Sequence, residues 1–360
     1  MNHHHFHIVF ARRGDDAPTP QFIRMLEHAA HQRGMNFVHC KNHEQAETLR
    51  WALQRGTLHV DCLIDYMGRS FRNDYELGCA VKDAGGMVLD DPDRVRIYGD
   101  KAVIHQELER VGLAMPRTLL WRPEQPSRDL SAAEQAYLGR RIVCKPARGS
   151  GSGGVVLGME PTAAALADAR DYDDEDTYLL QEFVEPIDLE GRPAWFRVYN
   201  CFGTVLPCFW HPETHATELV TPEQIARYGL HELERISRTI ALVSGYTWFS
   251  TEIALTWRSG RFAFLPIDYL NNKCFMLTHA EFGASGMPMQ VAETVTREIA
   301  EQALHRARRA RPGPHPLQCL FNPQRGACVD CDGPGQPGRR ICEDAPQPGF
   351  PVRERAGAPQ

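Results

Sequence analysis

The sequence predicts an α/β protein in which an N-terminal open parallel sheet is followed by two α+β lobes. The first ninety residues alternate short apolar runs with longer amphipathic stretches, as β-α-β-α units of a parallel sheet do. Beyond them, short strands are separated by loops and few helices, which is typical of α+β lobes. The 360 residues are 42% hydrophobic and 24% charged, the balance of an ordinary soluble chain with two or three packed parts.

The elements of the first part follow from their apolar periods. We expect strands at 8–10, 37–40, 60–64 and 87–89, and helices at 22–31, 44–53 and 75–84. The turn after the first strand, residues 11–14, has a single glycine. It cannot form a dinucleotide-binding loop, which argues against NAD bound by the familiar glycine fingerprint.

The rest of the chain begins after a break at Asp91 and Pro92. A helix is expected at 100–111, because Gly112 and Pro116 then end it. Strands are expected at 141–144, 155–157, 178–184, 196–201, 205–209, 248–255 and 262–267, with helices at 231–243 and up to about Arg309. We therefore expect domains at 1–98, 99–187 and 188–311, followed by a tail at 312–360.

Charge and hydropathy exclude several classes of partner. The net charge of −6 gives no reason to expect nucleic acid. The one basic cluster follows an apolar row at helical spacing, so it suits the last turn of a helix; it comprises Arg306, Arg308, Arg309 and Arg311. No apolar run reaches the length of a membrane span and no secretion signal is visible, so we expect a cytoplasmic protein with reduced thiols and no membrane partner.

The tail of 49 residues holds 10 prolines and 7 glycines without a sustained apolar period, so we expect it to be flexible. Its four cysteines leave two interpretations open: Cys319, Cys328, Cys331 and Cys342. They could bind Zn²⁺ tetrahedrally and order the tail, or they could be spare thiols. Their outer spacings match no zinc ribbon, which favours spare thiols.

The strongest motif is a lysine at the end of a strand followed by a glycine-serine loop. Lys145 could neutralise phosphate oxygens while the amides of the loop at 148–154 close over them. The loop is not a Walker A motif, and taken alone it could be a linker. Lys101, at the start of a helix, could be a second phosphate cation, and Arg197 is a charge in an apolar strand that needs a partner such as phosphate.

Two further segments suit a nucleotide site. The strand ending in Gln181, Glu182, Phe183 and Val184 could present backbone groups to adenine, or could be a plain edge strand. Glu252 on one predicted strand, and Asp268 at the end of the next, would offer the hard oxygen ligands that Mg²⁺ prefers. An asparagine, Asn271 or Asn272, completes the set.

Together these motifs, from about residue 60 to 304, resemble the ATP-grasp superfamily. The resemblance implies that two α+β lobes clamp ATP, with Lys101 and Lys145 on the phosphates and Arg197 directed at phosphate or the acyl phosphate. It implies that 181–184 bind adenine, that Asp188, Glu185 or Glu190 binds ribose, and that Glu252, Asp268 and Asn271 bind metal. The phosphate loop would comprise Arg148, Gly149, Ser150, Gly151, Ser152 and Gly153.

Three departures from the family pattern are visible. The spacing from Gly260 to Asp268 is longer than usual. The usual Glu-x-Asn is replaced by Asp268-x-x-Asn271. A customary arginine is also missing near Trp210, where His211 and His215 could contact substrate or could be structural.

The resemblance implies an ATP-dependent ligase that joins a carboxylate to an amine through an acyl phosphate, with Mg²⁺, or Mn²⁺ in its place. The substrates would be small molecules or peptides, and a homodimer stays open. The alternatives are a kinase of the same fold and a nucleotide-binding protein without activity.

Overall fold

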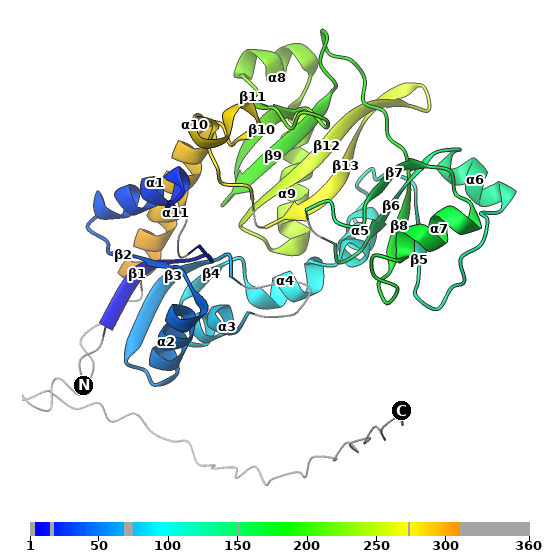
Figure 1. Ribbon diagram of the computed structural model, residues 1–360. Helices are drawn as coiled ribbons and strands as arrows, with labels where there is room; N and C mark the ends of the chain where they lie inside the picture. Colours follow the sequence, from blue (N-terminus) through cyan, green and yellow to red (C-terminus); the bar gives the residue numbers. More distant parts are fainter. Residues whose placement is uncertain (1–3, 15–17, 68–74, 150, 273, 310–360) are drawn as a thin grey trace, which may run out of the picture. The chain divides into compact units, whose positions relative to one another are not determined.

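A computed structural model of the chain describes residues 4–14, 18–67, 75–149, 151–272 and 274–309. The chain divides into two units, Met1–Arg311 and Pro312–Gln360. The second unit, with its four cysteines, lies outside the described residues. The first unit contains three sheets (Figure 1). Among the described residues, no helix is both long and apolar enough to cross a membrane.

The first sheet is parallel, as predicted, with strand order β2-β1-β3-β4. Its strands are β1 (His4–Ala11), β2 (Phe37–Cys40), β3 (Leu58–Asp65) and β4 (Met87–Leu89). Successive residues of β1 pack on opposite sides, since Ile8 and Phe10 belong to one core and Val9 and Ala11 to another. The helices that cover the two faces are α1 (Gln21–His31) and α11 (Met289–Arg309) on the first side, and α2 (His43–Gln54) and α3 (Glu76–Asp83) on the second.

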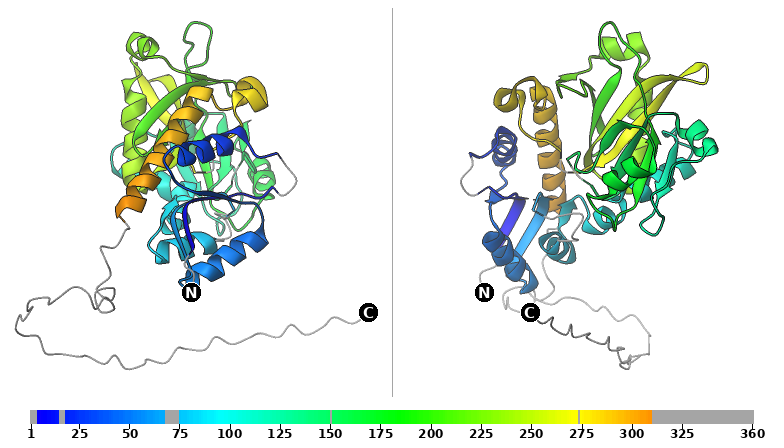
Figure 2. Two further views of the ribbon diagram at one scale, coloured as in Figure 1. Left: turned by 90° about the vertical axis from the view of Figure 1, so that its left-hand side faces the viewer. Right: turned by 45° about the vertical axis from the view of Figure 1, so that its right-hand side comes forward.

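Helix α11 packs against β1, β3 and α1, although the chain reaches it only after both other sheets (Figure 2). Its buried stripe includes Val291, Val295 and Ile299, the helical row seen in the sequence, and its last turn carries the expected arginines Arg306, Arg308 and Arg309. The domain limits at 98, 187 and 311 stay a proposal. Helix α11, at the end of the third of these domains, packs on the sheet of the first, so the first domain is not covered by its own residues alone.

The second sheet has the order β5-β8-β6-β7, and all its pairings are antiparallel. Its strands are β5 (Thr118–Trp121), β6 (Ile142–Pro146), β7 (Val156–Met159) and β8 (Tyr178–Glu182), with helices α6 (Ala132–Leu138) and α7 (Ala163–Arg170). The sequence reading missed β5. Strand β8 therefore lies between two neighbours, and the interpretation of this segment as an edge strand was wrong.

The third sheet is antiparallel, with the order β11-β10-β9-β12-β13. Its strands are β9 (Trp195–Cys201), β10 (Thr204–Trp210), β11 (Thr217–Leu219), β12 (Trp248–Arg258) and β13 (Arg261–Asn271). Helix α9 (His231–Ser244) packs on it through Leu233, Ile236 and Ile240. The other helical elements between β11 and α11 are α8 (Pro222–Tyr228), α10 (His279–Phe282) and the short 3₁₀ turn η2 (Gly283–Ser285).

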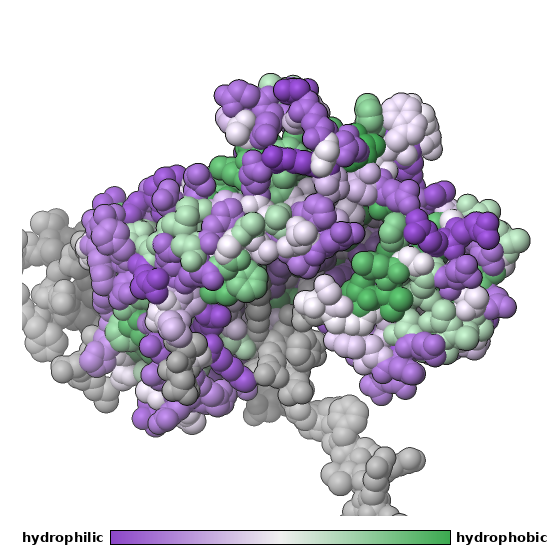
Figure 3. All heavy atoms as spheres, turned by 45° about the horizontal axis from the view of Figure 1, so that its top comes forward, coloured by the Kyte–Doolittle hydropathy of each residue, from purple (hydrophilic) through white to green (hydrophobic). Residues whose placement is uncertain are grey.

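Two helices lie between the first and second sheets in the chain: α4 (Pro92–Tyr98) and α5 (Lys101–Arg110). The predicted break at Asp91 and Pro92 is the start of α4, since the Asp91 side chain accepts from the amides of Asp93 and Arg94 and Pro92 occupies the first turn. Asp100 caps α5 in the same way. On the face of the molecule in Figure 3, hydrophobic residues form small groups among hydrophilic ones.

Candidate functional site

Three charged residues form a row across neighbouring strands of the third sheet. Arg197 of β9 is the register partner of Glu252 of β12, which in turn is the partner of Asp268 of β13. Directly opposed residues project from the same face of a sheet, so the three side chains lie together. Arg197 Nη2 donates to Glu252 Oε1 at 2.8 Å, and its guanidinium lies 4.7 Å from the centre of the Trp210 ring.

The two acids of the row repel each other. Burial raises the pKa of Glu252; the Arg197 guanidinium opposes this rise and the Asp268 carboxylate adds to it. Asp268 Oδ1 is buried and has no hydrogen-bond partner among the described residues. Paired carboxylates with an unused buried oxygen suit a hard divalent cation such as Mg²⁺.

The pairing of β13 with β12 is irregular on both sides of Asp268, and this decides which side chains of β13 share a face with the row. The partners Ser250↔Asn271, Glu252↔Asp268 and Ile253↔Pro266 show that β13 uses an extra residue on each side of Asp268. Strand β12 stays in regular register with β9, so the bulges belong to β13. Ser250 and Glu252 share a face, and Asn271, opposite Ser250, therefore shares the face of Asp268.

The bulge explains the departure from Glu-x-Asn spacing. In a regular strand, Asp268 would share its face with Leu270, whereas the extra residue moves Asn271 into that place. Asn272 lies beyond the end of β13. We expect Asn271→Ala to raise the Mg²⁺ concentration needed for half-maximal ATP binding by about 10-fold. Titration of Mg²⁺ at fixed ATP measures this, with Asn272→Ala as the matched control that should behave like wild type. The reverse order of the two variants would contradict the assignment.

Lys145 links the second sheet to the third. Its side chain is buried, Nζ donates to the carbonyl of Ile267 at 2.7 Å, and the ammonium lies 5.1 Å from the centre of the Tyr269 ring. Burial lowers the pKa of Lys145 from 10.5 to about 8; Asp268 opposes the shift and Lys101 adds to it. Lys145 thus lies within electrostatic range of the second predicted lysine and of the acidic row.

The glycine-serine loop is held at its start. The ammonium of Lys101 donates to the carbonyl of Gly149, and the amide of Arg148 donates to Asp176 at 2.8 Å. Arg148 itself is mostly exposed and lies 3.4 Å from Asp100. A side chain at Gly149 would meet Pro146 at 2.5 Å, so this position needs glycine.

The tip of the loop departs from ordinary backbone conformations. Gly151 and Ser152 both have positive φ and are exposed, whereas Gly153 is partly buried. Ser150 lies outside the described residues. Bare amides in such a loop are suited to phosphate oxygens.

The end of β8 was predicted to bind adenine. The side chain of Gln181 donates to Thr118 and to the Tyr269 hydroxyl, both at 2.8 Å, and Glu182 is ion-paired with Arg117 at 2.6 Å and Arg258 at 3.2 Å. Phe183 and Val184 follow the strand and are half-buried, and the Arg141 guanidinium lies over the Phe183 ring. Because the two polar side chains are engaged, recognition of a base here would fall to backbone groups.

The three acids proposed for ribose all have partners within the protein. Asp188 accepts from the amide of Gly191 at 2.7 Å, Glu185 pairs with Arg141 at 2.6 Å, and Glu190 accepts from the Tyr228 hydroxyl at 2.7 Å. All three are exposed. The contact of Asp188 closes a local turn and says nothing about ribose. Ribose binding by Asp188 therefore stays a prediction.

The two histidines near Trp210 also have structural contacts. His211 Nδ1 faces the amides of Glu213 and Thr214 at 3.3 Å each, which favours the structural interpretation. His215 has a φ of 57° and its ring lies 5.4 Å from that of Trp210.

Sequence reasoning missed Tyr269, which is at the centre of the site. It is fully buried between the two predicted metal ligands of β13, and its hydroxyl lies 2.7 Å from His105 Nδ1 and accepts from Gln181. Burial lowers the pKa of His105 to about 4, so this imidazole is neutral near pH 7. The sequence showed only that an aromatic residue follows Asp268. Aromatic residues are common in strands, so this did not single out Tyr269 as part of a site.

Several solved structures are similar to this chain. The RimK domain protein ATP-grasp from Sphaerobacter thermophilus has a TM-score of 0.54 and 16% identity over 82% of this chain and 99% of that one. The D-alanine–D-alanine ligase of Bacillus anthracis complexed with ATP has a TM-score of 0.54 and 12% identity over 84% and 98%. The ATP-grasp ligase PsnB, complexed with a phosphomimetic variant of its minimal precursor, Mg and ADP, has a TM-score of 0.52 and 15% identity over 82% and 98%.

No family model matches the chain, and no curated protein matches it. At these identities the structures show the fold alone. The chain has the ATP-grasp fold, and the predicted fold is confirmed.

Proposed function

We propose, from the ATP-grasp fold and the row of Arg197, Glu252 and Asp268 beside Lys145, that the protein is an ATP-dependent carboxylate-amine ligase. The row is the observation that carries the proposal, because a cation and two acids on one face suit a phosphate, a divalent metal and a substrate anion together. Structures of the same fold hold ATP, or Mg and ADP, which supports the choice of nucleotide and metal.

The metal ligands would be Glu252, Asp268 and Asn271. Their fit to Mg²⁺ is supported by the unused buried oxygen of Asp268 and by the raised pKa of Glu252, since a bound cation offsets both. Mn²⁺ takes similar oxygen ligands and should substitute. When bound, the ion would screen the charge of the ATP phosphates.

The chain's own residues have distinct roles in this proposal. Lys101 and Lys145 neutralise phosphate, and the amides of the loop at 148–153 close over it. Arg197 holds the substrate carboxylate in line with the γ-phosphate. The carboxylate oxygen attacks the γ-phosphorus and ADP leaves. The amine then attacks the acyl carbon and gives up one proton to solvent, and phosphate leaves with the carboxylate oxygen. The partners are therefore small-molecule or peptide carboxylates and amines.

The fate of the phosphoryl group tests the reaction. A screen of carboxylates and amines for ADP release supplies a substrate pair, and the carboxylate is then labelled with ¹⁸O. We expect the label in released phosphate, and a hydroxamate when hydroxylamine replaces the amine, because an acyl phosphate is electrophilic at carbon. A stable phosphorylated product with ADP and no free phosphate would instead identify a kinase. Tight ATP binding without turnover of any pair would identify a non-enzymatic nucleotide-binding protein.

A further inference from the structure

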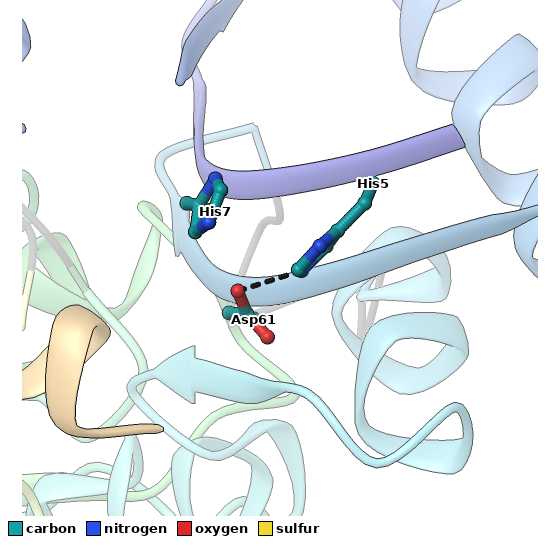
Figure 4. Close-up of side chains that lie close together, drawn as sticks. All are labelled: His5, His7 and Asp61. Atoms are coloured by element: carbon teal, nitrogen blue, oxygen red, sulfur yellow. Dashed lines mark hydrogen bonds and ion pairs between the residues drawn. The ribbon is translucent and has the colours of Figure 1, made fainter. Parts of the chain in front are cut away.

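A cluster of imidazoles and one carboxylate lies at the amino ends of β1 and β3. His5 and His7 come from β1, and His59 and Asp61 from β3. His5 and His59 are register partners of the parallel pair. One ligand atom each of His5, His7 and Asp61 lies within 4.8 Å of the others. Figure 4 shows these three side chains close together. Among the described residues, this is the only such group of three or more metal-ligand side chains.

The carboxylate of Asp61 is completely buried. His5 Nε2 lies 2.8 Å from Oδ2, and His59 Nε2 lies 3.2 Å from Oδ1. No lysine or arginine forms an ion pair with Asp61 among the described residues. A buried carboxylate is costly without a compensating cation, and the ion-pair partners of Asp61 among the described residues are imidazoles, which can share a metal ion with it.

From this arrangement we propose that His5, His7 and Asp61 form a binding site for a divalent transition-metal ion of the Zn²⁺ class. Two imidazole nitrogens and one carboxylate oxygen are the ligands such an ion takes, with water in the fourth position. Tetrahedral Zn²⁺ with bonds of about 2.0–2.1 Å needs donors about 3.3 Å apart. Donors already within 4.8 Å reach that spacing by small rotations of side chains.

The ligands have supporting contacts of the kind found around metals. His7 Nδ1 lies 2.8 Å from Asn36 Oδ1, which also accepts from the His7 amide at 2.7 Å. The backbone amide of Asn36 also points at Nδ1, at 3.3 Å, but the shorter contact to the Asn36 side-chain oxygen requires a proton on Nδ1 and leaves Nε2 as the ligand atom. His59 contacts the second oxygen of Asp61 and so orients the carboxylate as a positioning residue. His5 is about half exposed, which gives an ion access from solvent.

This site is independent of the proposed ligase site. It uses the starts of two strands of the first sheet, whereas the acidic row uses the third sheet. Its ligands are mainly nitrogen, which favours Zn²⁺, Co²⁺ or Ni²⁺ over Mg²⁺. The ion would fasten β1 to β3 near the start of the described chain.

Co²⁺ titration of the full chain, followed by visible absorption, tests the site. We expect wild type to show the d–d bands of a tetrahedral nitrogen-oxygen site, and H5A/H7A to lose them with at least about 100-fold weaker binding. His59→Asn should weaken binding by about 10-fold. Zn²⁺ should raise the melting temperature of wild type but not of H5A/H7A.

Three controls separate this site from other metal-binding groups. His43→Ala removes an exposed histidine outside the cluster and should bind like wild type. Asp268→Asn, in the proposed ligase site, should keep the bands. A variant with serine at Cys319, Cys328, Cys331 and Cys342 should also keep them. Absence of the bands in wild type, bands that persist in folded H5A/H7A, or bands of thiolate type alone would each overturn the proposal; if H5A/H7A does not fold, His7→Gln is measured in its place.

Discussion

Replacing Lys145 by methionine should lower ATP turnover by about 10²–10³-fold without lowering the melting temperature. The ammonium would offset charge on the transferring phosphoryl group, and loss of such a donor costs about 2.7–4 kcal/mol. Burial lowers the pKa of Lys145 from 10.5 to about 8. Holding the lysine charged therefore costs the folded protein about 3 kcal/mol of free energy of unfolding. Methionine has similar length and no charge, so the fold should keep or gain stability.

The sign of the pH dependence follows from that lowered pKa. The cost of holding the ammonium is fully present below pH 8 and disappears as the pH rises towards 10.5, where the unfolded chain also loses its proton. The stability advantage of Lys145→Met should therefore be largest near pH 7 and shrink above pH 8, as melting curves can measure. Lys82→Met is the control, since Lys82 is a surface lysine paired with Asp91 and Asp93. Wild-type turnover by folded Lys145→Met would mean that the site is misplaced.

The sequence predicted the elements with a clear apolar period. The run at 60–64 fell within the buried strand β3, and the row Val291, Val295, Ile299 was the buried stripe of α11. It did not reveal that α11 returns to the first sheet, since a helical period says which face is buried and not against what. The short strands β2 and β4 were predicted from their place in the β-α rhythm of the first sheet, whereas the equally short β5 lies outside such a rhythm and was missed. The seven-residue α4 was also missed, since about two turns carry little helical period.

For the candidate site, the sequence supplied residue types but not their contacts. Glu252 and Asp268 were expected together on neighbouring strands and Arg197 was identified separately, yet the row that joins all three depends on the register of β9, β12 and β13. Two bulges in β13 shift that register. Within 266–271 only Pro266 hints at them, because proline in a sheet is confined to edges and bulges, and β13 is an edge strand in any case. The ion pairs of Glu182 with Arg117 and Arg258 were likewise invisible, because their partners are far away in the chain.

Asp268→Asn should reduce magnesium-dependent turnover by at least about 100-fold, more than Asn271→Ala does. A carboxylate contributes charge as well as an oxygen ligand, and loss of outer contacts to a metal ligand alone costs about 10–100-fold. Asparagine keeps the shape of the side chain, so the register of β13 should be unchanged. Steady-state rates across a Mg²⁺ titration measure the effect, with Asp174→Asn, an exposed position, as the matched control.

Without metal, Asp268→Asn should not weaken the protein and should favour both its thermal stability and its binding of ATP. Asp268 adds to the raised pKa of Glu252, so neutralising Asp268 removes a repulsion between neighbouring carboxylates. We expect metal-free Asp268→Asn to melt at or above the wild-type temperature and to bind metal-free ATP at least as tightly, since one negative charge near the phosphates is gone. Mg²⁺ with ADP should then raise the melting temperature of wild type by more than that of the variant. Full turnover by Asp268→Asn at wild-type Mg²⁺ concentrations would exclude Asp268 as a metal ligand.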